Sequence, residues 1–441
     1  MKFRRIAALL TAAVMSVSAL GVTSFAEDPV MLPIIEDVRK DTVTLFGCEV
    51  PADAEQACFI TGDKDDFMTR MYKDYSPDYG EDYYYVREGV KVDCAEIAEK
   101  LPNLKSLSIL ISDVENFSEL SKLKKLTTLE IQVNKGTTDI SFVKSMKQLT
   151  TLKYIDVECT DISAVRGLTK LTTLELNGAF TDISAVSGLT SLRRLKLDGA
   201  FEDIKPLKKL TKLKKLYLDS GRLSDISTLK YLKNLTELSL FDRNNIKDIS
   251  VVGGLTKLKT LELHTMKLKT LAPIKKLKNL ETLGVMYVNC PDTKSVIATK
   301  KNLKNLYFLE SISGDCKFLS KLTKLESLEI MVSDVKSLEG LQTLKKLKNL
   351  SISYNFRDFD LTPIKGLTKL EGLYITGNEI SDISMLSRLK NLKVLSAWNT
   401  KITDYSVILN MPKLEKLMPD YLDPELEAQF REKNPDCEIL Y

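Results

Sequence analysis

Fifteen leucines recur along this chain at intervals of only 21 to 23 residues, and this period constrains the fold more than any other feature. They are Leu107, Leu129, Leu152, Leu174, Leu195, Leu216, Leu238, Leu261, Leu283, Leu306, Leu328, Leu350, Leu373, Leu395 and Leu417. Around each lies a version of the order L-x-x-L-x-x-L-x-L. A unit this short cannot bury its apolar face alone, so successive units must stack. Such a stack presents a long curved surface, which favours binding over catalysis.

The coil from Leu373 to Leu389 shows the pattern of one unit most clearly. Its opening residues alternate apolar with other side chains, which is the period of a strand. The step Asp382-Ile383-Ser384 then supplies a helix-capping oxygen before a short helical or 3-10 turn. The same step recurs at Asp161, Asp182, Asp225 and Asp248. We therefore predict an α/β solenoid, a leucine-rich-repeat horseshoe of about 14–15 coils, with a parallel β-sheet on the concave face and short 3-10 or helical segments on the convex face.

The order L-x-x-L-x-L-x-x-N-x-I-x-D-I-x-x-L of Leu370 to Leu386 resembles the internalin-type leucine-rich repeats of bacterial surface and secreted proteins. The resemblance covers about three quarters of the chain and implies recognition of a protein or a glycan. The family's asparagine, which bonds the turn backbone, is present at Asn134, Asn355 and Asn378 and is replaced elsewhere by residues such as Ser112, Val157, Gly221 and Met266. We expect those turns to satisfy their backbone groups differently.

The first 26 residues have the pattern of a signal peptide. Residues 1–5 give a positive start, 6–22 an apolar run, and Ser24-Phe25-Ala26 places small residues at the cleavage positions. We expect cleavage after Ala26, a secreted protein and no transmembrane segment afterwards, since the alternative, a membrane anchor, would need a longer apolar run. We expect residues 27–88 to be an acidic region of uncertain fold, 89–418 the solenoid with its N-terminal cap, and 419–441 a C-terminal cap in which 424–433 form a short helix.

Charge is divided along the chain. Residues 27–88 carry a net charge of −10 and residues 89–441 a net charge of +11. Two roles are open for lysines such as Lys208, Lys209 and Lys212. They either keep the flanks of the solenoid soluble or attract an anionic wall polymer or glycan. Nucleic acid is not an expected partner of an exported chain with nearly balanced charge.

Catalytic and metal sites find little support in the sequence. His264 is the only histidine, and no nucleophile lies near it in the sequence. The carboxylates Glu130, Glu175, Glu262 and Glu329 share one outward repeat position, so a glycan hydrolase is a less favoured alternative. The cluster at Asp63, Asp65 and Asp66 lacks the glycine and glutamate of a calcium loop. We expect no cofactor, no metal and no enzymatic activity.

Seven cysteines leave at least one without an intramolecular partner. Cys48 and Cys58 are close enough in sequence to pair, and Cys290 and Cys316 lie on adjacent coils.

Lys300 stands where the repeat calls for a leucine, which marks the coil of Leu283 as the weakest seam of the stack.

The concave surface can be read from the residues one and three places after each repeat leucine, because strand side chains alternate. These positions are mostly polar in the first half of the stack and become aromatic or apolar from Tyr217 onward. The concave strip is the set Tyr217, Phe241, His264, Met286, Tyr307, Leu309, Met331, Tyr374 and Trp398. Exposed residues of this kind indicate a contact site for a protein ligand, with glycan or cell-wall polymer binding as the alternative. Close packing of these side chains against one another is the other interpretation.

Overall fold

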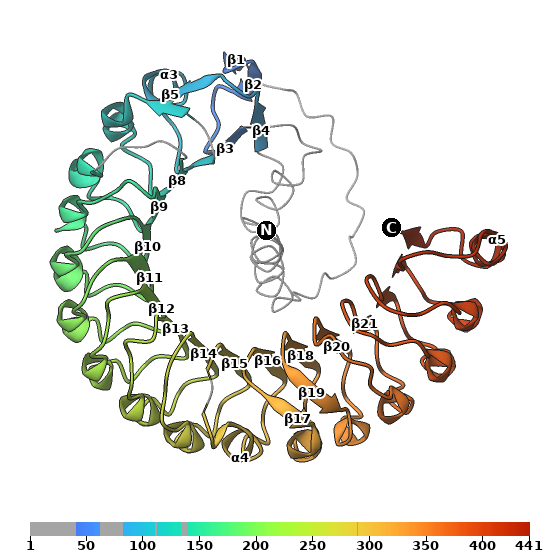
Figure 1. Ribbon diagram of the computed structural model, residues 1–441. Coiled ribbons are helices and arrows are strands. Elements are labelled where there is room, and N and C mark those ends of the chain that lie inside the picture. The colour runs from blue at the N-terminus through green and yellow to red at the C-terminus, as the bar shows by residue number, and fades with distance from the viewer. Residues whose placement is uncertain (1–40, 62–82, 111–112, 134–138, 289) are drawn as a thin grey trace. The chain divides into compact units, whose positions relative to one another are not determined.

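The computed structural model describes residues 41–61, 83–110, 113–133, 139–288 and 290–441. The chain divides into two compact units, unit 1 ending at Cys159 and unit 2 beginning at Thr160. Each unit is built from parallel strands that alternate with short helices (Figure 1). All fifteen repeat leucines lie on strands, so the predicted leucine-rich-repeat solenoid is confirmed.

Unit 1 contains five parallel strands in the order β4–β3–β6–β8–β9. Its strands are β1 Thr42–Leu45, β2 Cys48–Pro51, β3 Gln56–Thr61, β4 Tyr83–Val86, β5 Lys91–Asp93, β6 Ser106–Leu110, β7 Asp113–Glu115, β8 Thr128–Gln132 and β9 Thr151–Ile155, and its helices are α3 Cys94–Lys100, η2 Phe117–Lys122 and η3 Ser141–Ser145. β1 and β2 form an antiparallel hairpin. β3 pairs with β6, placing Ala57 beside Leu107, so residues before position 89 share the sheet of the first repeat strand.

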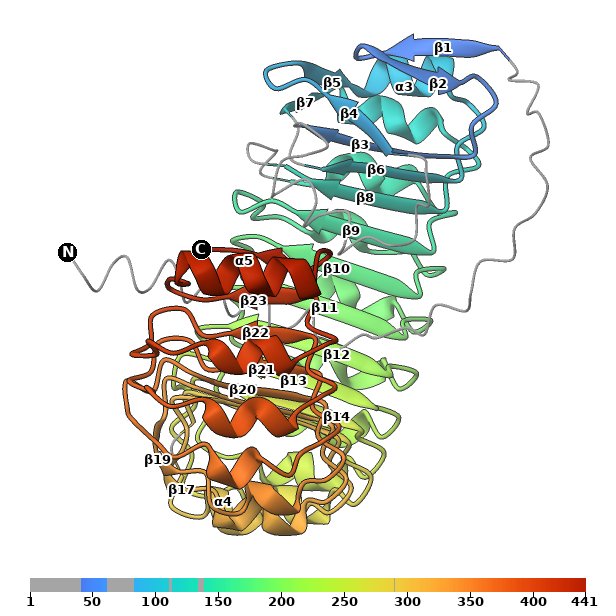
Figure 2. The ribbon, with the colours of Figure 1, turned by 90° about the vertical axis from the view of Figure 1, so that its right-hand side faces the viewer.

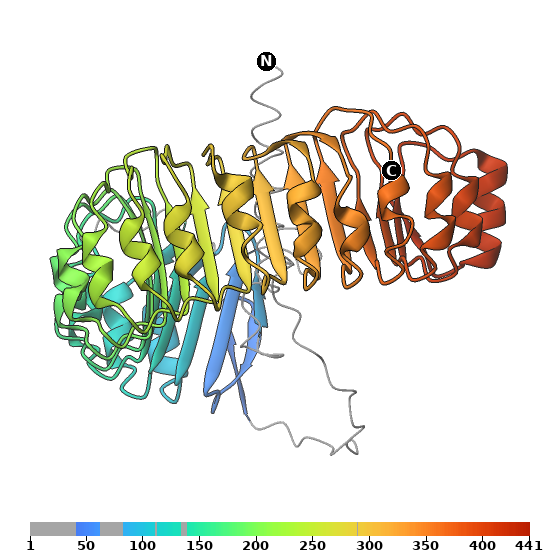
Figure 3. The ribbon, with the colours of Figure 1, turned by 90° about the horizontal axis from the view of Figure 1, so that it is seen from below.

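Unit 2 continues the same pattern, with thirteen described strands in one parallel ladder. They are β10 Thr173–Asn177, β11 Arg194–Gly199, β12 Lys215–Ser220, β13 Glu237–Phe241, β14 Thr260–His264, β15 Thr282–Met286, β16 Asn305–Leu309, β18 Ser327–Met331, β20 Asn349–Ser353, β21 Gly372–Tyr374, β22 Val394–Ser396, β23 Lys416–Met418 and β24 Glu438–Ile439. A short pair, β17 Ser313–Asp315 and β19 Asp334–Ser337, lies outside this ladder. The sheet lines the inner side of unit 2 (Figures 1 and 3).

Short helices form the outer side of unit 2, as predicted (Figure 3). They are η4 Ser163–Val165, η5 Ser184–Gly188, η6 Lys205–Lys209, η7 Ser227–Tyr231, η8 Ser250–Gly254, η9 Ala272–Lys276, α4 Thr293–Ile297, η10 Lys317–Lys321, η11 Leu341–Thr343, η12 Thr362–Ile364, η13 Ser384–Arg388, η14 Ser406–Asn410 and α5 Pro424–Lys433. Most are 3-10 turns of three to five residues, because a coil this short leaves room for only one turn between two strands.

The core of unit 2 is a column of repeat leucines in register. Leu174 lies opposite Leu195, and Leu195 lies opposite Leu216. Each of the three is at most 2% exposed. Removing a leucine side chain from water contributes about 1.5–3 kcal/mol, so the column is a large stabilising contribution in each coil.

Aspartates begin the outer turns, as the Asp-Ile-Ser step predicts. The Asp225 carboxylate accepts hydrogen bonds from the Ser227 amide at 2.7 Å and from the Ser227 hydroxyl at 3.1 Å. The same pair of bonds recurs at Asp161, Asp182 and Asp248. The bond from the Ser227 amide is the main cause that lowers the pKa of Asp225.

The family asparagine links neighbouring coils where it is present. The side chain of Asn378 donates to the carbonyls of Ile352 at 2.6 Å and Ile375 at 2.8 Å, and its Oδ1 accepts from the Asn355 amide at 3.1 Å. Asn355 in turn accepts from the Ser333 amide at 3.2 Å. Where asparagine is absent, other groups substitute: the Asp242 carboxylate accepts the Ile246 amide. Asn134 lies outside the described residues.

Replacing Asn378 by alanine removes the partners of buried backbone groups on two coils. We expect Asn378→Ala to lower the free energy of unfolding by about 2–4 kcal/mol, measured by urea denaturation. The control is Asn234→Ala, because exposed Asn234 donates to a single carbonyl, that of Thr211. Equal losses for the two variants would contradict the structural role of Asn378.

Lys300, which stands in place of a repeat leucine, is buried and bonded to the preceding coil, a contact that the sequence did not predict. Its side chain is 5% exposed and its Nζ donates to the carbonyls of Ile274 at 2.8 Å, Lys275 at 3.0 Å and Leu277 at 3.1 Å. These carbonyls end η9 on the preceding coil, where a cation also interacts favourably with the helix end. The lysine thus fastens two coils together at the place of the missing leucine.

Lys300→Ala removes these three bonds and leaves a cavity. We expect a loss of about 2–4 kcal/mol in the free energy of unfolding, whereas Lys300→Leu, which restores the repeat pattern, should lose less. Chemical denaturation of both variants measures the difference, and an alanine variant as stable as the parent would contradict the bridging role.

The cysteines are all thiols, so neither candidate disulfide is present in the structure. Cys48 donates to the Tyr85 carbonyl at 3.3 Å, and Cys290 donates to the Leu268 carbonyl at 3.2 Å. Burial raises the pKa of Cys316 to about 12. Such thiols are protonated at neutral pH and serve as small core residues.

The end of unit 2 carries the helix predicted for the C-terminal cap. α5 lies beside the last strands (Figure 2) and packs on η14. Asp423 begins it by accepting the amides of Glu425 and Leu426, and Phe430 is fully buried. None of the helices described in the structure is long and apolar enough to cross a membrane.

Candidate functional site

The concave face of unit 2 consists of two parallel rows of side chains, set by the strand register. The first row contains Tyr217, Ser239, Glu262, Gly284, Tyr307, Glu329, Ser351 and Tyr374 on consecutive strands. The second row contains Asp219, Phe241, His264, Met286, Leu309 and Met331. Neighbours in a row are about 4.8 Å apart along the sheet. The register therefore brings eight of the nine predicted strip residues, all except Trp398, into two adjacent rows.

Aromatic rings stack at the start of the strip. The ring centroids of Tyr217 and Phe241 are 4.7 Å apart, and those of Phe241 and His264 are 3.5 Å apart with a 17° angle between the planes. The Lys196 ammonium lies 4.8 Å from the centroid of the Tyr217 ring. These contacts make a rigid ridge across three strands.

The strip is more deeply buried than its outward positions predict. Met286, Tyr307, Leu309, Met331 and His264 are all 3–8% exposed. The reason is physical: neighbouring strands are so close that large side chains in a row cover one another. Packing within the strip and a contact site are therefore compatible, because a preorganised surface loses little entropy on binding.

Tyr374 and Trp398 are the last two residues of the predicted strip along the chain. Tyr374 occupies the first row beside Ser351. Trp398 follows β22 and is 43% exposed, with its carbonyl accepting from the Gly377 amide. Two further aromatics, Tyr354 and the 57% exposed Phe356, lie where the chain leaves β20. Both have positive φ angles, which the repeat pattern does not predict for aromatic residues.

Two carboxylates lie within the first row and were not part of the predicted strip. Glu262 accepts a hydrogen bond from the Ser239 hydroxyl at 2.7 Å. Glu329 is 7% exposed and has no hydrogen-bond or ion-pair partner among the described residues. Burial raises the pKa of Glu329 to about 7. Reading the residues across strands, rather than along the chain, would have placed both carboxylates among the aromatics.

A pair of aspartates borders the strip. Asp198 and Asp219 lie opposite each other on β11 and β12. Burial, followed by the charge of Asp198, raises the pKa of Asp219 to about 6, while Arg243 and Lys196 act in the opposite direction. Asn177 donates to Asp198 at 2.6 Å. This border is polar and charged, in contrast to the apolar strip beyond it.

The four glutamates at the shared outward position have separate environments. Glu130 pairs with Lys153 at 3.2 Å, and Glu175 pairs with Arg194 at 2.7 Å. Glu262 and Glu329 are three strands apart, roughly 14 Å at the usual strand spacing, which exceeds the separation that glycoside hydrolysis uses. The described residues contain no group of three potential metal ligands, and Asp63, Asp65 and Asp66 lie outside them.

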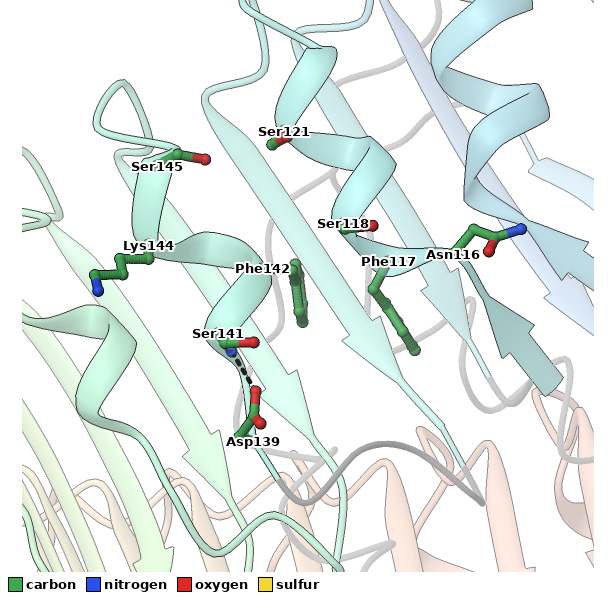
Figure 4. A pocket seen from close by; sticks show the side chains of 9 residues that line it. All are labelled: Asn116, Phe117, Ser118, Ser121, Asp139, Ser141, Phe142, Lys144 and Ser145. Atoms are coloured by element: carbon green, nitrogen blue, oxygen red, sulfur yellow. Dashed lines mark hydrogen bonds between the residues drawn. The ribbon is translucent and has the colours of Figure 1, made fainter.

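Unit 1 has a hollow of its own on the side of its short helices. About 800 Å³ in volume, it is bordered by η2 and η3 (Figure 4). Phe117 and Phe142 stack within it with ring centroids 5.1 Å apart. Serines and Lys144 form its rim, and Asp139 accepts the Ser141 amide at 2.7 Å. The repeat pattern does not predict this hollow, because its aromatics come from the outer turns and not from the strands.

Comparisons with known proteins agree with this fold. No protein-family model matches the chain, and no curated protein matches it. Among solved structures, an internalin (InlF) from Listeria monocytogenes is 26% identical, with a TM-score of 0.55 over 69% of this chain and 89% of that one. A leucine-rich-repeat protein of Leptospira interrogans is 23% identical, with a TM-score of 0.58 over 78% and 91% of the two chains. The chain thus has the leucine-rich-repeat fold and is similar to the internalin InlF, as its repeat pattern indicated.

His264 should make stability depend on pH. Burial lowers its pKa from 6.5 to about 3, and its Nε2 has no hydrogen-bond partner among the described residues. The unfolded chain takes up this proton near pH 6.5 and the folded chain does not, so stability present at pH 7 is lost as the pH falls toward 3.

Relative to His264→Phe, we expect the parent to lose about 2 kcal/mol of unfolding free energy between pH 7 and pH 5. Urea denaturation at both pH values measures the difference. Identical pH dependence in the two proteins would show that His264 is solvated in the folded state.

Proposed function

We propose that this chain is a secreted, non-enzymatic recognition protein that binds a protein ligand through the concave face of unit 2. The observation that carries the proposal is the strip itself. Its aromatic, methionine and leucine side chains lie side by side on consecutive strands, bordered by charged groups. Large apolar side chains at the centre with a polar border are typical of protein-binding surfaces.

The rigidity of the strip supports binding by preorganisation. The backbone of each strand is bonded to both neighbours, and the Tyr217–Phe241–His264 stack fixes its rings. Little conformational entropy remains to be lost when a ligand binds such a surface. Rigid display, with no chemical step, is the mechanism that these residues favour.

Secretion is part of the proposal and rests on the signal-peptide pattern of residues 1–26, which lie outside the described part of the structure.

The absence of enzymatic activity, also part of the proposal, is supported by the arrangement of polar groups. His264 is buried against Phe241, and the first-row carboxylates are too far apart for paired acid–base work.

A second candidate is binding of an anionic wall polymer or glycan through the outer lysines. Lys208, Lys209 and Lys212 are exposed. Part of this charge is already engaged, since Lys215 pairs with Glu237 at 2.9 Å and Lys208 lies 4.9 Å from the ring centroid of Tyr231. Binding of this kind would weaken strongly by about half-molar salt, where screening acts within a few ångströms.

The test compares capture by the parent with capture by Tyr374→Ala/Trp398→Ala. Both side chains reach the surface of the strip, so the fold should survive, as circular dichroism can verify. We expect a protein from host-cell or bacterial-wall extracts, identified by mass spectrometry, to bind the parent and to be depleted at least tenfold with the variant. Binding should persist in half-molar salt.

The matched control is Tyr231→Ala, which removes an exposed ring from the outer side at η7. It should capture the ligand as well as the parent does. Equal capture by all three proteins, or capture only of polymers released by salt, would refute the strip as the binding surface and favour the lysines.

A further inference from the structure

The first row contains a gap between two tyrosines. Its order across strands β16 to β21 is Tyr307, Glu329, Ser351, Tyr374, so the small side chain of Ser351 separates Tyr374 from the Glu329–Tyr307 pair. Ser351 is turned to the neighbouring Ser353, whose Oγ lies at 3.2 Å. We call the stretch of the first row from Tyr307 to Tyr374, in which Glu329 and Ser351 lie between the two tyrosines, the gap.

A carboxylate without a partner lies in this gap. Glu329 is more than nine-tenths buried, accepts no hydrogen bond from described residues and forms no ion pair with them. Among the described residues, the enclosed side-chain atoms without a partner are His264 Nε2 and Thr293 Oγ1, so the Glu329 oxygens still reach the surface and are open to a donor of a ligand. The matching group Glu262, at the same repeat position, does have a partner in Ser239.

The surrounding face supplies no cation for Glu329. In both rows from β13 to β22, Glu262 and Glu329 are the only charged residues. Lysines at the starts of the strands are paired with other groups: Lys348 with Glu326 at 3.2 Å and Lys304 with Glu281 at 2.8 Å. The face is therefore complementary to a ligand that brings positive charge.

We propose that this gap binds a lysine or arginine side chain of the protein ligand, with the cationic group on Glu329 and its stem between Tyr307 and Tyr374. The inference rests on the proposed function and specifies its ligand chemistry. A cation on a carboxylate between aromatic faces gains both charge-assisted hydrogen bonds and cation–π attraction. Met331 and Leu309 beside it fit apolar neighbours of the basic residue.

Binding should release a proton from the site. Glu329 is ionised above about pH 7, and only the ionised form pairs with a cation. The groups facing it do not titrate in this range: burial raises the pKa of Tyr307 to about 12, raises that of Tyr374, and lowers that of His264 to about 3. Glu262, whose pKa burial also raises, lies three strands away.

The experiment uses acetyl-arginine methylamide as the probe and the purified protein labelled at methionine methyl groups. NMR shifts of Met286 and Met331 report binding on the strip. We expect saturable shifts with a Kd on the order of 1 mM at pH 8 and about tenfold weaker binding at pH 6, following the ionisation of Glu329. The neutral isostere acetyl-citrulline methylamide should bind at least fivefold more weakly.

Glu329→Gln should weaken binding at least fivefold and abolish its pH dependence, whereas Glu262→Gln, the same change at the same repeat position, should leave both unchanged. Equal affinity for arginine and citrulline probes, an unaltered Glu329→Gln variant, or preference for glucosamine over arginine would overturn the proposal. A different result would refute the proposed function instead: the arginine probe binds, but Tyr374→Ala/Trp398→Ala captures as much protein from the extracts as the parent does. Capture that depends on Tyr374 and Trp398 but not on Glu329 would leave the strip as an interface without this basic contact.

Discussion

The hydrogen-bonded register between neighbouring coils is the constraint on which the rest of this structure depends. It places each repeat leucine directly opposite the next, as Leu195 opposite Leu216, and so assembles the core from units that could not fold alone. The same register fixes the outward rows. A residue one place after a leucine lies beside its equivalent on the next strand. The same register therefore sets both the packing of the core and the arrangement of side chains that can contact a ligand.

Most of the architecture could be predicted from the sequence, because the period is carried by side chains that must be buried. The capping role of Asp225 and the C-terminal helix of Phe430 follow from local chemistry, and the structure confirms both. Lys300 could not be interpreted from the repeat, since its value depends on three carbonyls of the preceding coil that only the folded stack brings near its ammonium group.

The sequence predicted which residues belong to the candidate site, but it did not predict how deeply they are buried or which side chains surround them. Alternation identified Tyr307 and Met331 as facing the concave side, but not that neighbours would cover them to 6% exposure. Glu329 shows the same limit more sharply. In the sequence it shares a repeat position with Glu130, yet Glu130 lies beside Lys153 and Glu329 beside Ser351. The chemistry of each outward residue depends on its neighbours across strands. Those neighbours lie 21 to 23 residues away in the sequence, so local sequence patterns do not identify them.

The asparagine contacts between coils give the stack a direction. The amide of Ser333 depends on Asn355, and the amide of Asn355 depends on Asn378, so each coil is completed by the one that follows it. A coil carrying this asparagine can be duplicated or deleted within the run without leaving an amide unsatisfied, because donor and acceptor repeat together. Between Ser333 and Asn378 the chain is thus suited to gain or lose whole units during evolution, and the number of strands available to a ligand can change there while the fold is kept.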